Sequence, residues 1–129
     1  MKVLNKKDFL QMPAGTFFCV GTPWVFGNLC LKGESWHDSG DFLYVDVCDI
    51  EARNDTQRIL LLENSLERGF SFCINQDVSR DGMHNDDDLF LVYEKEDLEI
   101  LRSLVNAALM TIENNNQFDD VKIPENFIS

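Results

Sequence analysis

The residues best placed to do chemistry lie in one acidic stretch, Asp77 to Asp88, where oxygen-bearing side chains recur at the spacing of a calcium loop. Such a loop of twelve positions needs oxygen ligands at positions 1, 3, 5, 7, 9 and 12 and a glycine at position 6. Gly82 stands at position 6, and the carbonyl of Met83 would serve position 7. The candidate side-chain ligands are Asp77, Ser79, Asp81, Asn85 and Asp88. Both flanks predict strands rather than helices, so the alternative is an acidic hairpin loop that turns on Asp81-Gly82, with no cofactor.

A catalytic set is not evident elsewhere. The two histidines, His37 and His84, lie in polar loops, and no phosphate-binding glycine loop, nucleophile elbow or zinc-spaced pair is present. The remaining carboxylates that could act are Asp46, Asp49 and Glu51. Of these, Asp46 shares a strand face with apolar residues, so it is either functional or paired with one of three nearby arginines. These arginines are Arg53, Arg58 and Arg68. We therefore expect a protein that binds and does not catalyse.

Aromatic and cationic residues are the candidates for ligand binding. Trp36 lies in a polar stretch, where it either stacks on a ligand or folds back over the core. Cations are scarce in this chain, so each arginine is a candidate partner for a phosphate group or for an acid of the chain itself. The predicted ligand-binding residues are Trp24, Trp36, Arg53, Arg58 and Arg80.

Length and charge narrow the class of protein. The chain has 129 residues, 44% hydrophobic residues and 10 phenylalanines, which predicts one globular domain over residues 1–129. The formal net charge of -12 argues against general binding to nucleic acid or to an anionic membrane, because both need positive surface. The N-terminus has no apolar leader segment, which favours a cytoplasmic protein. Each of the 4 cysteines lies among apolar neighbours, which predicts reduced, buried thiols.

The pattern of apolar residues predicts an α+β fold, a small, mostly antiparallel β-sheet or partial barrel with two main helices. Asn54 and Gln57 predict a helix start, and Gly69 predicts its end, with Ile59, Leu62 and Leu66 as the buried stripe. The expected helices are residues 5–12, 54–68 and 94–114, and the expected strands are residues 16–20, 24–31, 42–50, 70–74 and 89–93. Residues 32–40 are expected to form a polar loop.

The helix expected at residues 94–114 carries an apolar face wider than one sheet can cover. We expect it to pack on the sheet with one flank and on the other main helix or another subunit with the second, which favours a homo-oligomer. After three consecutive asparagines the tail remains rich in apolar residues. Residues 115–129 are therefore predicted to be a C-terminal arm that docks on the sheet or on a neighbouring subunit.

Three segments carry a resemblance to known proteins: residues 9–17, residues 26–34, and residues 80–82 followed by 87–97. In these segments the chain resembles small acidic proteins of phages and prophages of Gram-positive hosts. That resemblance implies a counter-defence role, for example as an oligomeric sponge that sequesters nucleotide-derived immune signals such as those of Thoeris systems.

The sequence therefore leaves three alternative functions open. The first is a non-enzymatic binding protein in the host cytoplasm that sequesters a small nucleotide-derived signal. The alternative is an acidic inhibitor that covers a basic host protein such as a defence nuclease. The third is a calcium- or magnesium-dependent enzyme that uses the stretch from Asp77 to Asp88.

Overall fold

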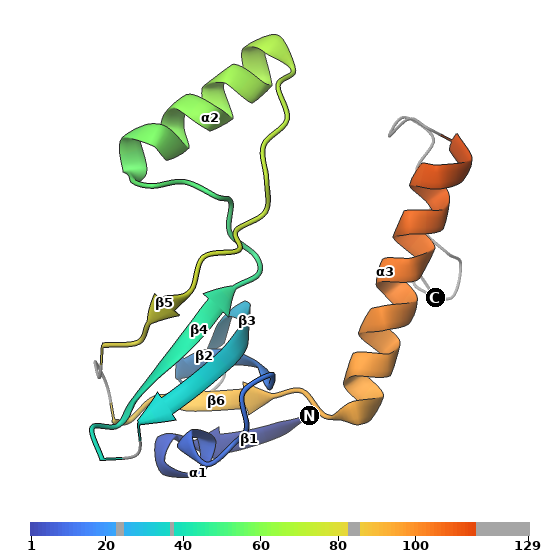
Figure 1. The fold of residues 1–129 in the computed structure, drawn as a ribbon. Helices are drawn as coiled ribbons and strands as arrows, with labels where there is room; N and C mark the ends of the chain where they lie inside the picture. The colour runs from blue at the N-terminus through green and yellow to red at the C-terminus, as the bar shows by residue number, and fades with distance from the viewer. Residues whose placement is uncertain (23–24, 37, 83–85, 116–129) are drawn as a thin grey trace. The chain divides into compact units, whose positions relative to one another are not determined.

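The computed structural model describes residues 1–22, 25–36, 38–82 and 86–115 (Figure 1). The chain divides into two compact units, Met1–Tyr93 and Glu94–Ser129. The first unit holds the sheet and two helices, and the second holds the longest helix. The expected single domain over residues 1–129 stays a prediction.

The first unit is built on one six-stranded sheet in the order β1-β6-β2-β3-β4-β5, and every neighbouring pair is antiparallel. Its strands are β1 (Lys2–Asn5), β2 (Phe17–Thr22), β3 (Val25–Trp36), β4 (Asp41–Asp46), β5 (Ser79–Arg80) and β6 (Leu89–Val92). The helices of the described residues are α1 (Lys6–Leu10), α2 (Asp55–Arg68) and α3 (Lys95–Asn115). The predicted α+β fold with a small antiparallel sheet and two main helices is confirmed.

The core lies on one face of this sheet, beneath α1. Asn5 caps α1 by accepting a hydrogen bond from the backbone N–H of Asp8, and this short helix brings Phe9 over the sheet. Phe9 is fully buried, and its ring stacks on Phe90 at 4.0 Å between ring centroids. Phe18 and Phe42 complete the aromatic cluster from β2 and β4. Four aromatic rings from four separate elements therefore close this part of the face.

Several strand predictions need correction. Residues 32–40 are not one polar loop, because β3 continues through Trp36 with a register shift between Lys32 and Ser35. The strand expected at residues 42–50 ends at Asp46. Residues 70–74 form only an isolated bridge between Ile50 and Ile74. Periodicity did not reveal β1 and β5: β5 has two residues and pairs with the longer β4, and β1 has four residues and pairs with β6, which is equally long.

Helix α2 has the predicted ends. The Asn54 side chain accepts a hydrogen bond from the backbone N–H of Gln57 at 2.8 Å, and Gly69 ends the helix with φ 73°. Its apolar stripe is nevertheless exposed at Ile59, Leu62 and Leu66, and no residue of the helix is buried. The expected burial of this stripe against the long helix stays a prediction, because helical spacing defines an apolar side without defining what covers it.

Helix α3 is the predicted long helix. The Asp97 carboxylate accepts a hydrogen bond from the backbone N–H of Glu94 at 2.9 Å, so acids occupy the helix start as expected. The expected packing of this helix on the sheet, on a second helix or on another subunit stays a prediction. The C-terminal arm predicted at residues 115–129 lies outside the described residues from residue 116 onward.

Candidate functional site

A pocket opens on the same sheet face as the aromatic core. Phe18 is paired with Cys30 and Cys30 with Asp46, so these residues form a row across β2, β3 and β4. Tyr44 lies two residues before Asp46 and therefore on the same face. The pocket has a volume of about 310 Å³. It is lined by Phe18, Val20, Gly27, Asn28, Cys30, Phe42, Tyr44, Asp46 and Asp81, and we call it the Asp46 pocket.

The Asp46 carboxylate is held by neutral donors. One oxygen accepts a hydrogen bond from Asn28 Nδ2 at 3.3 Å, and the other accepts one from the backbone N–H of Cys48 at 2.9 Å. The sequence predicted that an arginine would neutralise this carboxylate or that it would be functional. Among the described residues no cation forms an ion pair with it, and Arg58, one of the three predicted partners, is engaged by Asp49 instead. Within the described part of the chain, its negative charge therefore has no cation paired with it.

The thiol and the phenol of the pocket stay protonated at neutral pH. Burial, with a smaller contribution from the negative charge of Asp46, raises the pKa of Cys30 to about 12. Burial also raises the pKa of Tyr44, and the charges of Asp81 and Asp46 add to this effect. A thiol with so high a pKa is a poor nucleophile. The carboxylates are thus the charged groups of the pocket, and Cys30 is not suited to covalent chemistry.

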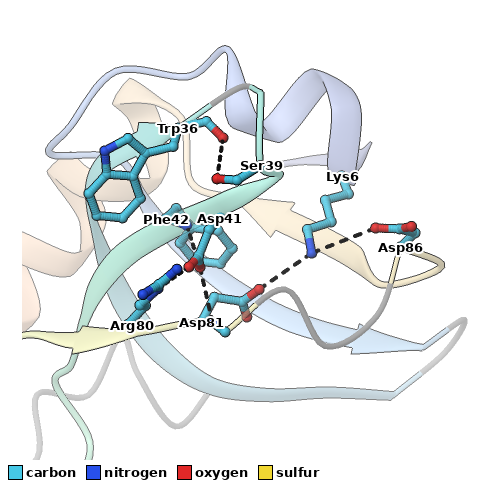
Figure 2. A network of polar contacts seen from close by, with 9 residues as sticks. Lys6, Trp36, Ser39, Asp41, Phe42, Arg80, Asp81 and Asp86 are labelled. Carbon is cyan, nitrogen blue, oxygen red and sulfur yellow. Dashed lines mark hydrogen bonds and ion pairs between the residues drawn. The ribbon is translucent and has the colours of Figure 1, made fainter.

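Asp81 joins the pocket to a second polar network, which Figure 2 shows from close by. Lys6, only 5% exposed, lies 3.4 Å from Asp81 and 4.0 Å from the exposed Asp86. The ion pair to Asp81 brings the start of α1 together with the segment after β5. Lys6 therefore offsets much of the charge of Asp81 but does not pair with Asp46.

The centre of the second network is Asp41, whose side chain is fully buried. It accepts hydrogen bonds from the backbone N–H groups of Phe42 at 2.8 Å and Gly82 at 3.0 Å, and its other oxygen pairs with Arg80 (Figure 2). Burial acts to raise the pKa of Asp41, but the hydrogen bonds from Arg80, Phe42 and Gly82 outweigh it and hold the pKa below its usual value. The guanidinium of Arg80 also lies over the Trp36 ring, 5.8 Å from its centroid.

A second buried cation, Lys32, is committed to the core. It is 2% exposed, and its Nζ donates hydrogen bonds to the Gly33 carbonyl at 3.1 Å and to Ser35 Oγ at 3.0 Å. The same ammonium lies 5.7 Å from the centroid of the Phe9 ring. Burial lowers its pKa. These contacts give Lys32 a structural role beside the register shift of β3.

The predicted ligand-binding residues do not form one site. Trp36 and Arg80 come together, and both are substantially exposed, whereas Arg58 pairs with Asp49. Arg53 lines a separate hollow of about 470 Å³ with Gln57, Phe72 and Asp77 among its neighbours. Trp24 lies outside the described residues.

The predicted calcium ligands do not form a metal-binding group where they are described. Ser79 pairs with Tyr44 in the β4–β5 ladder, and Asp81 points to Lys6. Burial and the charge of Asp81 raise the pKa of Asp88. Across the described ranges, no group of three or more His, Cys, Asp or Glu residues is arranged to hold a metal ion. Asn85 lies outside these ranges, so the complete twelve-position loop stays a prediction.

Sequence reasoning missed Asp41 and misjudged two cysteines. Asp41 precedes a predicted strand by one residue, and only the pairing of β4 with β5 brings Arg80 beside it. Cys19 and Cys30 are buried as expected, but Cys48 and Cys73 are exposed, because the segment that holds them leaves the sheet after Asp46. Both histidines, His37 and His84, lie outside the described residues.

Comparisons with protein-family models, with curated proteins and with solved structures found no match to this chain. In the described part of the chain, no helix combines the length and the hydropathy that crossing a membrane requires. Functional inference therefore depends on the geometry of the Asp46 pocket and of the Asp41 network.

Proposed function

We propose that this protein is a non-enzymatic binding protein that covers a basic surface on another protein. The class of target implied by the resemblance to phage proteins is a host defence protein such as a nuclease. Acidic inhibitors of this kind use charge complementarity to speed association and to exclude wrong partners.

The observation that carries this proposal is that acidic side chains outnumber cationic ones and that several of the cations are already engaged within the protein. The chain has 11 Lys and Arg residues against 23 Asp and Glu residues. Four of these cations are engaged inside the first unit: Lys6 with Asp81, Lys32 with the core, Arg58 with Asp49 and Arg80 with Asp41. The Asp46 carboxylate, in contrast, has no cationic partner among the described residues. Because Lys6 and Lys32 are buried, the surface offered to a partner carries fewer cations than the composition indicates.

A capture experiment at two salt concentrations tests this function. The full-length protein is immobilised, incubated with lysate of a Gram-positive host, and the bound proteins are identified by mass spectrometry. We expect a reproducible basic partner whose retention falls steeply between low and high salt, because exposed charges are screened over roughly 10 Å at 0.1 M salt. The identified partner is then purified, and its activity is measured with and without the protein. Retention that does not fall with salt, or a partner whose activity is unchanged, contradicts the proposal.

A second candidate function is favoured by Trp36 and Arg80. The indole is 47% exposed, and Arg80 lies over its ring, so one aromatic face and one guanidinium are close together at the surface. A small nucleotide-derived signal could stack there, in pockets completed by another subunit of a homo-oligomer. Asp41 already neutralises Arg80, which makes this site weaker for an anion than the sequence suggests.

Thermal unfolding with a panel of cyclic nucleotides and ADP-ribose derivatives tests this second candidate. A ligand at 100 times its dissociation constant adds about 2.7 kcal/mol to the free energy of unfolding. Stabilisation that disappears in Trp36→Ala would support signal sequestration. An unchanged melting temperature across the panel at millimolar concentration would remove this candidate.

A further inference from the structure

The Asp46 pocket has the size of a site for one side chain. Its volume of about 310 Å³ is at the lower end of the roughly 300–1,000 Å³ found for pockets that hold small molecules. Gly27 and Asn28 form its exposed side, and Gly27 contributes no side chain that could obstruct entry. The pocket is therefore suited to a narrow group that enters from a partner.

The inner wall of the pocket is aromatic and aliphatic. Phe18 and Phe42 are buried behind it, and the partly exposed Tyr44 lies against Phe42 with ring centroids 6.0 Å apart. Because Tyr44 is fixed by this contact, its ring offers a preformed surface on which a planar group can stack. Val20 adds an aliphatic side to the same pocket.

Asp46 provides an unused acceptor capacity beside that ring. An ionised carboxylate has about four lone-pair sites, and Asp46 uses two of them for Asn28 and the backbone of Cys48. Two sites remain for an incoming donor, and the existing hydrogen bonds hold both oxygens in place. Asp81 adds a second carboxylate that Lys6 compensates.

An arginine satisfies all of these features at once. Its aliphatic stem matches the apolar side of the pocket, its guanidinium is planar and stacks on an aromatic ring, and its paired N–H groups match the two oxygens of a carboxylate. A lysine ammonium would pair with the charge of the carboxylate, but it could neither stack flat on the aromatic ring nor donate to both carboxylate oxygens in parallel. An anionic group such as phosphate would face the negative charge of Asp46 directly, whereas the charge of Asp81 is offset by Lys6.

We infer that the Asp46 pocket binds an arginine side chain of the partner protein, stacked on Tyr44 and hydrogen-bonded to Asp46. This inference depends on the proposed function for its partner, but the pocket itself can be tested without one. The site would give the acidic surface a point of specificity that net charge alone cannot supply.

Titration of the isotope-labelled full-length protein followed by NMR tests the pocket. The probe is N-acetyl-arginine amide, and its control is N-acetyl-citrulline amide, which has nearly the same shape without the charge. We expect saturable shifts for the backbone amides around Asn28, Cys30 and Asp46 with the arginine probe only. This comparison uses the natural sequence and does not depend on the folding of any variant. Equal shifts with citrulline, or arginine shifts that spread over acidic residues without saturating, would overturn the inference.

A pair of variants then assigns the effect to one carboxylate. Asp46→Asn removes the charge but keeps the shape, and Glu63→Gln removes one negative charge from an exposed position of α2. We expect Asp46→Asn to weaken binding of the arginine probe about tenfold, which corresponds to the loss of one charge-assisted hydrogen bond. Glu63→Gln should leave the dissociation constant unchanged. Equal weakening by both variants would show that only net charge matters and would overturn the inference.

The same variants separate this inference from the proposed function. If the protein captures a basic partner and Asp46→Asn captures it equally well, the function stands and the pocket assignment fails. If the arginine probe binds the pocket but no basic partner is captured, the pocket stands and the function fails.

Discussion

Two parts of the first unit differ sharply in how they use apolar residues. Around α1, the phenylalanines at positions 9, 18, 42 and 90 are at most 1% exposed. Residues 47–78, which include α2, contain no buried residue, although they carry Ile59, Leu66 and Phe70 at 54%, 88% and 57% exposure. The difference teaches that apolar content does not define a core. Elements distant in sequence must converge on it, and in this unit they converge beneath α1.

The largest effect is expected from removing the ring at the centre of the core. Phe9→Ala should lower the free energy of unfolding by about 3–5 kcal/mol, because it deletes a fully buried ring and leaves a cavity among three other rings. Phe70→Ala is the matched control in the second region, where the ring is exposed. Urea denaturation of both variants measures the contrast, and similar losses for the two would refute it.

The next effect is expected at the buried ion pair. Asp41→Asn should lower the melting temperature by roughly 10 °C, because a buried amide would then face the Arg80 guanidinium without a charge to balance it. Circular dichroism during heating at pH 7 measures the change. A variant with the same melting temperature as the natural protein would show that the carboxylate is not needed for stability.

The same carboxylate predicts a pH dependence. The pKa of Asp41 is depressed in the folded protein. The contribution of its carboxylate to the free energy of unfolding is therefore fully present above the unfolded-state pKa of about 3.9, and it is lost as pH falls through the folded-state pKa. The difference in melting temperature between the natural protein and Asp41→Asn should therefore shrink as pH falls below about 4. A difference that stays constant down to pH 2.5 would contradict this assignment.

Thiol reactivity should separate the two regions as well. Iodoacetamide at pH 8 should alkylate the exposed Cys48 and Cys73 at least about tenfold faster than the buried Cys19 and Cys30. Burial raises the pKa of both slow thiols, to about 12 for Cys30. Intact-mass spectrometry should show a plateau at two adducts, with peptide mapping to locate them. Early labelling of Cys30 would contradict the structure.

The smallest effect is expected at the ion pair of the second region. Asp49→Asn repeats the substitution made at Asp41, but Asp49 and Arg58 are 37% and 44% exposed. Solvent screens such a pair, so the melting temperature at pH 7 should change by less than about 3 °C. A loss as large as that of Asp41→Asn would mean that burial does not distinguish the two pairs.

Local signals in the sequence predicted the parts of this protein that depend on neighbouring residues. The ends of α2 follow from Asn54, Gln57 and Gly69, and the strand at Leu89–Val92 follows from its apolar run. These predictions succeed because capping and short-range periodicity act within one turn or one strand. The net charge of -12, from which we infer a basic partner, also comes from the sequence alone.

Only the tertiary structure decided which residues meet. The pairing of β4 with β5 places Arg80 against Asp41, and the register of β2, β3 and β4 aligns Phe18, Cys30 and Asp46. The spacing of residues along the sequence does not encode these contacts, because strand pairing brings together segments that lie far apart in the chain. For the same reason the sequence could name the apolar stripe of α2 but not the surface that covers it, since burial depends on a partner surface that a helix does not carry within itself.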